Sequence, residues 1–169
     1  MPNTKIIRQI QQRLLGNVSA TPGASSKGDF VTGLGIRVNK AAATIPQTTS
    51  QTIFTVTGGR VLVTLLFGEV TTVIQAGANN MSVESDPTVG VVSVLSSGLD
   101  IASLAVGILL TSEMDGTALI QGNAGMLGTG QGKAIISAGI ITCKTDASKT
   151  GATKWTLYYY PIDDGAYVS

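Results

Sequence analysis

The chain of 169 residues contains no histidine and a single cysteine, Cys143. Histidine is the side chain that titrates nearest neutral pH and the commonest metal ligand, while clustered cysteines hold structural zinc. The shortage excludes an internal disulfide and a Cys-based zinc site, and it removes the usual general base. Cys143 lies in an apolar alternating run, which favours a buried and unreactive thiol. We therefore expect a protein that is not an enzyme, with no catalytic residue, cofactor or metal.

Charged residues are also few. They make up 12% of the chain, about half the usual share, while apolar residues make up 43%. A chain of this length can build one domain with a sizeable core. Two interpretations of the low charge stay open: part of the surface is covered by partner subunits, or the surface is rich in Thr, Ser and Gly.

The charges are unevenly distributed along the chain. Residues 1–60 carry seven basic residues and one acid, a net charge of +6, whereas residues 61–169 carry four basic and nine acidic residues, a net charge of −5. A basic segment of this kind binds nucleic acid or an acidic protein surface. Lys5, Arg8 and Arg13 are few for phosphate binding, so nucleic acid is not expected and an acidic groove of a protein is favoured.

Residues 1–50 are predicted to form an N-terminal arm. Apolar residues fall at helical spacing over residues 1–16, and Gly16 ends the pattern. Residues 17–50 are rich in Gly, Ser, Thr and Ala, apart from a predicted strand at Leu34–Val38. Such a short helix is marginal alone and needs a surface to dock on. The residues expected to bind a partner are Lys5, Ile6, Ile7, Arg8, Ile10, Arg13 and Leu14.

From residue 51 onward the pattern is that of β-strands. Short runs of apolar and β-branched residues alternate with Gly, Asn, Asp and Pro turns. The predicted strands are Ile53–Val56, Arg60–Phe67, Val70–Ala76, Met81–Glu84, Val91–Leu95, Leu104–Leu110, Ala118–Ile120, Ala134–Ile136, Gly139–Lys144 and Lys154–Tyr160. The fold class is therefore all-β, with an antiparallel β-sandwich or jelly-roll-like body over 51–169. No apolar run is long enough to span a bilayer, so no membrane partner is expected.

Three features that could carry chemistry are better explained otherwise. The Gly-rich stretch Gly122–Lys133 fails as a phosphate loop, because Leu127 stands where the first glycine is needed. It is predicted to be a mobile or partner-binding loop. The pair Asp163-Asp164 is predicted to be a solvated turn. For Glu69, between apolar segments, a buried acid and a subunit contact both stay open.

The few aromatic residues, 5% of the chain, gather near its end. In a strand, Trp155 and Tyr159 share one face while Tyr158 and Tyr160 share the other. We expect one of these faces to join the core and the other to be half exposed. Because Trp and Tyr anchor protein interfaces, Trp155, Tyr158 and Tyr160 are candidate interface residues.

Three separated segments carry a resemblance to a known group of proteins. They are residues 48–80, TTSQTIFTVTGGRVLVTLLFGEVTTVIQAGANN; residues 86–90, DPTVG; and residues 151–168, GATKWTLYYYPIDDGAYV. Together they resemble small virion structural proteins of tailed bacteriophages, in particular capsid decoration (cement) proteins. The resemblance covers roughly residues 45–168.

This resemblance implies a β body on the outer surface of the capsid, made in the cytoplasm of a bacterial host. The implied partners are the major capsid protein and further copies of the chain, with a trimer or dimer favoured. The arm would tie neighbouring capsomers, and no catalytic residue carries over. Two alternatives stay open: a fibre or host-receptor module that binds glycans, and a ring subunit of the tail or connector.

Overall fold

The structure is a computed structural model that describes residues 34–126 and 132–169. The helix predicted over 1–16, with its partner-binding residues, lies outside the described residues, as does the arm up to residue 33. The described part is all-β, as the sequence predicts. Its strands are β1 (Ile36–Thr44), β2 (Ser50–Thr57), β3 (Val61–Thr72), β4 (Asn80–Pro87), β5 (Ser93–Asp100), β6 (Leu109–Thr111), β7 (Gly116–Ala118), β8 (Ile120–Gln121), β9 (Ala134–Ile136), β10 (Gly139–Thr145), β11 (Ala152–Pro161) and β12 (Tyr167–Val168).

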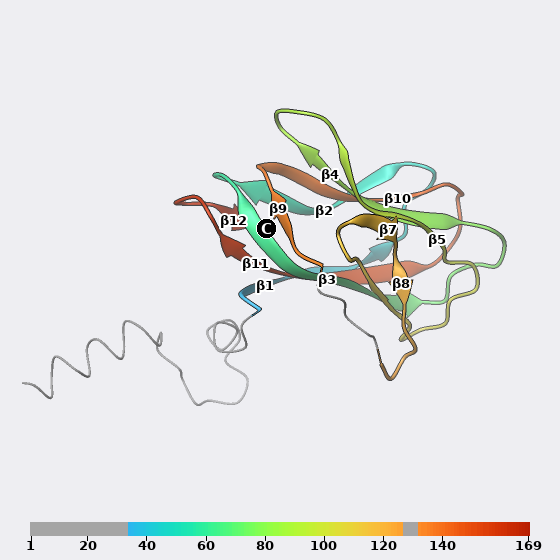
Figure 1. Cartoon of the computed structure of the whole chain (residues 1–169). Helices are drawn as coiled ribbons and strands as arrows, with labels where there is room; N and C mark the ends of the chain where they lie inside the picture. Colours follow the sequence, from blue (N-terminus) through green and yellow to red (C-terminus); the bar gives the residue numbers. More distant parts are fainter. Residues whose placement is uncertain (1–33, 127–131) are drawn as a thin grey trace, which may run out of the picture.

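The strands form two sheets packed as a sandwich (Figure 1). Sheet A has the order β1-β11-β3-β6-β8, with β9 also paired to β3, and sheet B has the order β12-β2-β10-β4-β5-β7. Eight of the twelve strands form four nested antiparallel pairs: β1 with β11, β2 with β10, β3 with β6 and β4 with β5. This is the strand order of a jelly roll, and the predicted all-β sandwich is confirmed. Sheet B is mixed, because β5 and β7 pair parallel.

One apolar core lies between the sheets. Strand alternation supplies it, because successive side chains of a strand point to opposite faces. Strand β3 shows this in Val61, Val63 and Leu66, which are fully buried, while its intervening side chains are only half buried. The other large side chains without solvent exposure include Met81, Leu110, Ile141 and Leu157. The core is thus built by both sheets.

Several predicted boundaries differ from the structure. The predicted strand Leu34–Val38 overlaps β1 only over Ile36–Val38. Because β1 is hydrogen-bonded to β11, residues 36–44 belong to the sandwich and not to a separate arm. The predicted strands Arg60–Phe67 and Val70–Ala76 leave Gly68 between them, yet β3 continues through it and pairs it with Trp155, whose ring lies 3.1 Å from where a Cβ would be. In the apolar run Leu104–Leu110 only the last two residues join a strand, β6. Strand β12 was not predicted.

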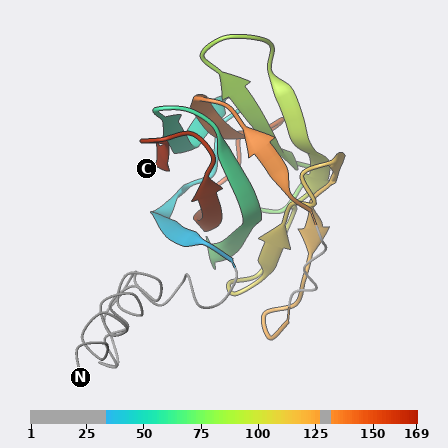
Figure 2. The ribbon, with the colours of Figure 1, turned by 60° about the vertical axis from the view of Figure 1, so that its left-hand side comes forward.

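The loop between β4 and β5 projects from the body in two views (Figures 1 and 2). It carries Val89 and Val91, which are 87% and 81% exposed, and Val92, which is about half exposed, as is Val94 at the start of β5. The predicted strand Val91–Leu95 therefore covers this loop and only the start of β5.

Candidate functional site

The outer faces of the two sheets differ in character. On sheet B, the side chains of β10 that alternate with the buried Ile141 and Cys143 are Ile140, Thr142 and Lys144, of which Thr142 is itself only 5% exposed. Their direct neighbours on β2 and β4 are polar in every row: Thr55 and Asp86, Thr52 and Glu84, Ser50 and Ser82. The outer face of sheet B is therefore mostly hydroxyl-bearing and charged. Its apolar residues in these rows are Ile140 and Val94 of β5, which pairs with Glu84 and is half exposed.

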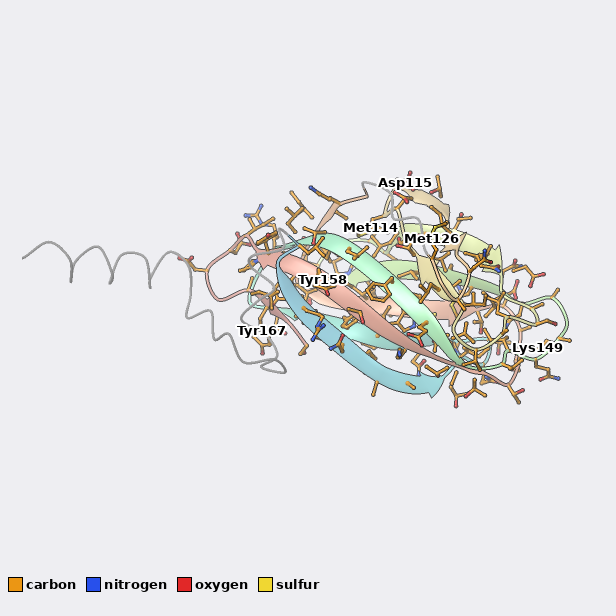
Figure 3. The ribbon with its side chains drawn as sticks, turned by 90° about the horizontal axis from the view of Figure 1, so that it is seen from below. Met114, Asp115, Met126, Lys149, Tyr158 and Tyr167 are labelled. Atoms are coloured by element: carbon orange, nitrogen blue, oxygen red, sulfur yellow. The ribbon has the colours of Figure 1, made fainter. Side chains whose placement is uncertain are left out.

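The outer face of sheet A is instead apolar and aromatic. Directly paired residues of neighbouring strands share a face, and Tyr158 of β11 pairs with Leu65 of β3, while Tyr160 pairs with Leu62. Leu62 pairs in turn with Ile135 of β9, whose side chain is 65% exposed. We call this surface the sheet A face; its residues are Leu62, Leu65, Phe67, Ile135, Tyr158 and Tyr160. Figure 3 looks onto sheet A, with Tyr158 labelled on β11.

A change of strand register lets β3 contribute to both sides. Tyr158 pairs with Leu65 and Tyr159 with Val63, so Thr64 is an extra residue on β3. The bulge allows Val63 and Leu66 both to enter the core while Leu65 stays on the outside. Thr64 is held there, because its hydroxyl donates a hydrogen bond to the carbonyl oxygen of Leu34.

Charged residues border the sheet A face. At one end the ammonium of Lys154 lies 2.8 Å from the carboxylate of Glu69, and both side chains are partly exposed. Glu69 is thus an ion-paired surface residue in this structure. A pair of this kind contributes about 0.2–1 kcal/mol to stability. On the neighbouring strand β1, Arg37 pairs in register with Tyr158 and Asn39 with Thr156, whose hydroxyl donates to the Asn39 side chain at 3.0 Å.

The candidate interface residues named from the sequence fall in two environments. Trp155 is only 2% exposed, and its indole N–H donates to the hydroxyl of Thr153 at 3.2 Å. It therefore belongs to the core and presents no surface to a partner in this structure. Tyr158 and Tyr160 are half buried on the sheet A face. Sequence reasoning missed the contribution of β3 and β9, because nothing in one strand says which strand lies beside it.

The remaining candidate residues are explained by local structure. Cys143 is buried, 1% exposed, and desolvation raises the pKa of its thiol to about 12. Asp163 lies in the predicted turn before Gly165, and hydrogen bonds from Arg60 lower the pKa of its carboxyl to about 2. Of residues 34–126 and 132–169, no three His, Cys, Asp or Glu side chains are grouped so that they could hold a metal ion. Nor does this part of the chain contain a helix long and apolar enough to cross a membrane.

Two shallow hollows lie away from the sheet A face. One, of about 280 Å³, is bordered by Thr44, Gln47, Thr72 and the segment 149–152, and the side-chain amide of Gln47 donates to the carbonyl oxygen of Lys149 there. The other, of about 210 Å³, includes Asn80, which donates two hydrogen bonds to the carboxylate of Asp146. These contacts tie neighbouring segments of the chain together.

No protein-family model, curated protein or solved structure matches this chain. The resemblance to capsid decoration proteins therefore stays an expectation from the sequence. The fold and the contrast between its two outer faces remain the structural basis for a functional proposal.

Proposed function

We propose that this protein is a structural subunit of a tailed-bacteriophage virion that binds the outer surface of the capsid and associates with further copies through the sheet A face. The observation that carries the proposal is the contrast between the apolar, aromatic outer face of sheet A and the largely polar outer face of sheet B. A surface enriched in Tyr, Phe and Leu is of the kind that protein interfaces bury.

Two further observations support this proposal. The jelly roll is a fold used by viral capsid domains, although the same fold also occurs in lectins and enzymes. The low share of charged residues, 12%, suits a protein whose surface is partly covered in an assembly. Because lectins share this fold, glycan binding is the alternative to the proposed capsid binding.

The test is co-sedimentation of the purified protein with empty capsids that lack it, together with mass photometry of the protein alone. We expect saturable binding at a fixed ratio to the major capsid protein, and a dimer or trimer in solution. Tyr158→Ala should weaken self-association. Tyr167→Ala is the matched control, because Tyr167 is a half-exposed tyrosine on β12 of the other sheet.

A second variant guards against effects on folding. Ile135→Glu places a charge on the three-residue strand β9 at a position that is already 65% exposed, so it should separate the copies without unfolding the body. Equal self-association of wild type, Tyr158→Ala and Ile135→Glu would refute a role for the sheet A face. If the protein failed to bind capsids but bound glycans on an array, receptor recognition would replace capsid decoration as the proposed function. A hexameric or dodecameric ring in mass photometry would indicate a tail or connector subunit.

A further inference from the structure

Strand β1 is the longest of the strands that end the two sheets in the described part of the chain. It ends sheet A with nine residues, whereas β8, β12 and β7 end the other edges with two, two and three. Strand β2 is also open over Ser50–Phe54, because β12 covers only Val56 and Thr57 and Ser169 bonds Thr55. Within the described residues β1 pairs only with β11, so the backbone groups along its other side have no partner there. Exposed strand edges are templates for pairing with another chain, and natural proteins usually shorten or block them.

A bulge limits the part of β1 that can accept a strand. The register with β11 is regular from Ile36 to Lys40 and shifts before Ala43, so Ala41 and Ala42 have no partner in β11. A bulge twists an edge locally and disfavours pairing beyond it. The segment that is regular and unblocked is therefore Ile36–Lys40, which we call the open edge.

The side chains of the open edge define what would pair with it. Ile36 and Val38 share a face with the buried residues Tyr159 and Leu157, yet Ile36 is 42% exposed and Val38 is only partly buried. The core therefore extends to this edge without being closed over it. An added strand would bury these two side chains if it placed apolar residues beside them.

The charge of the open edge is positive and unbalanced. Arg37 and Lys40 are exposed, and neither forms an ion pair with any described residue. No acidic residue occurs on β1 or β11, and the one acid of β3, Glu69, is already paired with Lys154. The complementary strand is therefore acidic.

We infer that Ile36–Lys40 accepts an extended acidic segment of a partner protein as an added strand of sheet A. Antiparallel addition continues the pairing of this sheet, which is antiparallel at each of its pairs. The segment carries acidic residues opposite Arg37 and Lys40 and an apolar residue opposite Val38. Main-chain hydrogen bonds supply affinity in such β-augmentation, and the alternating side chains supply specificity.

A second copy of β1 is a poor occupant of the same edge. Pairing two copies would bring two Arg37 and two Lys40 side chains into one ribbon without an acid on either strand. Like charges on neighbouring strands are destabilising. The two cations thus act against self-pairing of β1 while they favour an acidic partner.

The test is an NMR titration of the ¹⁵N-labelled full chain with a peptide of sequence Thr-Glu-Thr-Val-Glu-Val-Thr, at about 0.1 M salt. The backbone amides of Ile36–Lys40 should shift, and those pointing away from β11 should become slower in hydrogen exchange. The same peptide with Lys in place of Glu should leave them unchanged. Arg37→Glu combined with Lys40→Glu should raise the half-saturation concentration about tenfold, and Lys144→Glu, an exposed lysine on sheet B, should not.

Each other outcome overturns the inference. Equal binding of the Glu and Lys peptides would remove the role of charge. Amides of β1 that point away from β11 and already exchange slowly in the free protein would mean that the chain itself fills the edge. If this slow exchange depended on protein concentration, a second copy would fill it. Peptide binding is measured without capsids, so its failure is distinguishable from a failure of the protein to bind a virion.

Discussion

Arg60 donates three hydrogen bonds to the carboxylate of Asp163, a residue 103 positions later in the chain. Its backbone N–H and its Nε both donate to Oδ2, at 2.7 and 2.9 Å, and its Nη2 donates to Oδ1 at 2.8 Å. The contact ties the turn between β2 and β3 to the turn between β11 and β12. Sequence-local reasoning identified the Asp163 turn but could not identify its partner.

Removal of this contact should lower stability in a pH-dependent way. Hydrogen bonds from Arg60 lower the pKa of Asp163 from its ordinary 3.8 to about 2. A carboxyl whose pKa is lower in the folded state stabilises that state above pH 3.8, and the contribution is lost as pH falls toward 2. Asp163→Asn should therefore reduce the midpoint of urea unfolding at pH 7 and have little effect near pH 2. Asp164→Asn is the control on the adjacent residue; an equal loss from both variants would refute the specific contact.

Gly68 should tolerate no side chain, because of Trp155. A Cβ at position 68 would lie 3.1 Å from three carbon atoms of the indole ring, and the ring is buried in the core. Gly68→Ala should cost about 1–3 kcal/mol of unfolding free energy and shift the fluorescence of the only tryptophan in the chain. Gly125→Ala is the control, since no atom lies within 4 Å of a Cβ there. Unchanged stability and fluorescence in Gly68→Ala would show that the ring can move aside.

Two valines with opposite burial should respond differently to the same substitution. Val63 has no solvent exposure, whereas Val89 at the β4–β5 loop is 87% exposed. Val63→Ala leaves a cavity in the core and should cost about 2 kcal/mol. Val89→Ala should change the free energy of unfolding by less than about 0.5 kcal/mol. Chemical denaturation of both variants measures this difference, and similar losses would mean that the projecting loop is packed in solution.

The thiol of Cys143 should be unreactive in the folded protein. It is buried, and desolvation raises its pKa to about 12, so almost no thiolate exists at neutral pH. A thiol reagent should label it only in denaturant, with glutathione as a freely reacting reference. Rapid stoichiometric labelling without denaturant would contradict the burial of β10.

Part of the fold could be predicted because it depends on local pattern. In β11, alternation placed Trp155 and Tyr159 on one face and Tyr158 on the other, and the structure confirms it. In β3 the expected break at Gly68 was wrong, because the residue that occupies the space beside it, Trp155, is distant in sequence. The run Leu104–Leu110 was equally misleading: its buried members, Leu104 and Leu110, pack in the core although most of the run forms no strand.

The sequence by itself determined the all-β class, the apolar faces of its strands and the burial of Cys143, since each follows from side-chain alternation along a strand. Only the tertiary structure decided which strands are neighbours. Pairing of β3 with β11 and β9 gathers Leu62, Tyr160 and Ile135 on one surface. Pairing of β1 with β11 leaves Ile36–Lys40 at an open edge. Both surfaces depend on hydrogen bonds between residues far apart in the chain, which no local pattern encodes.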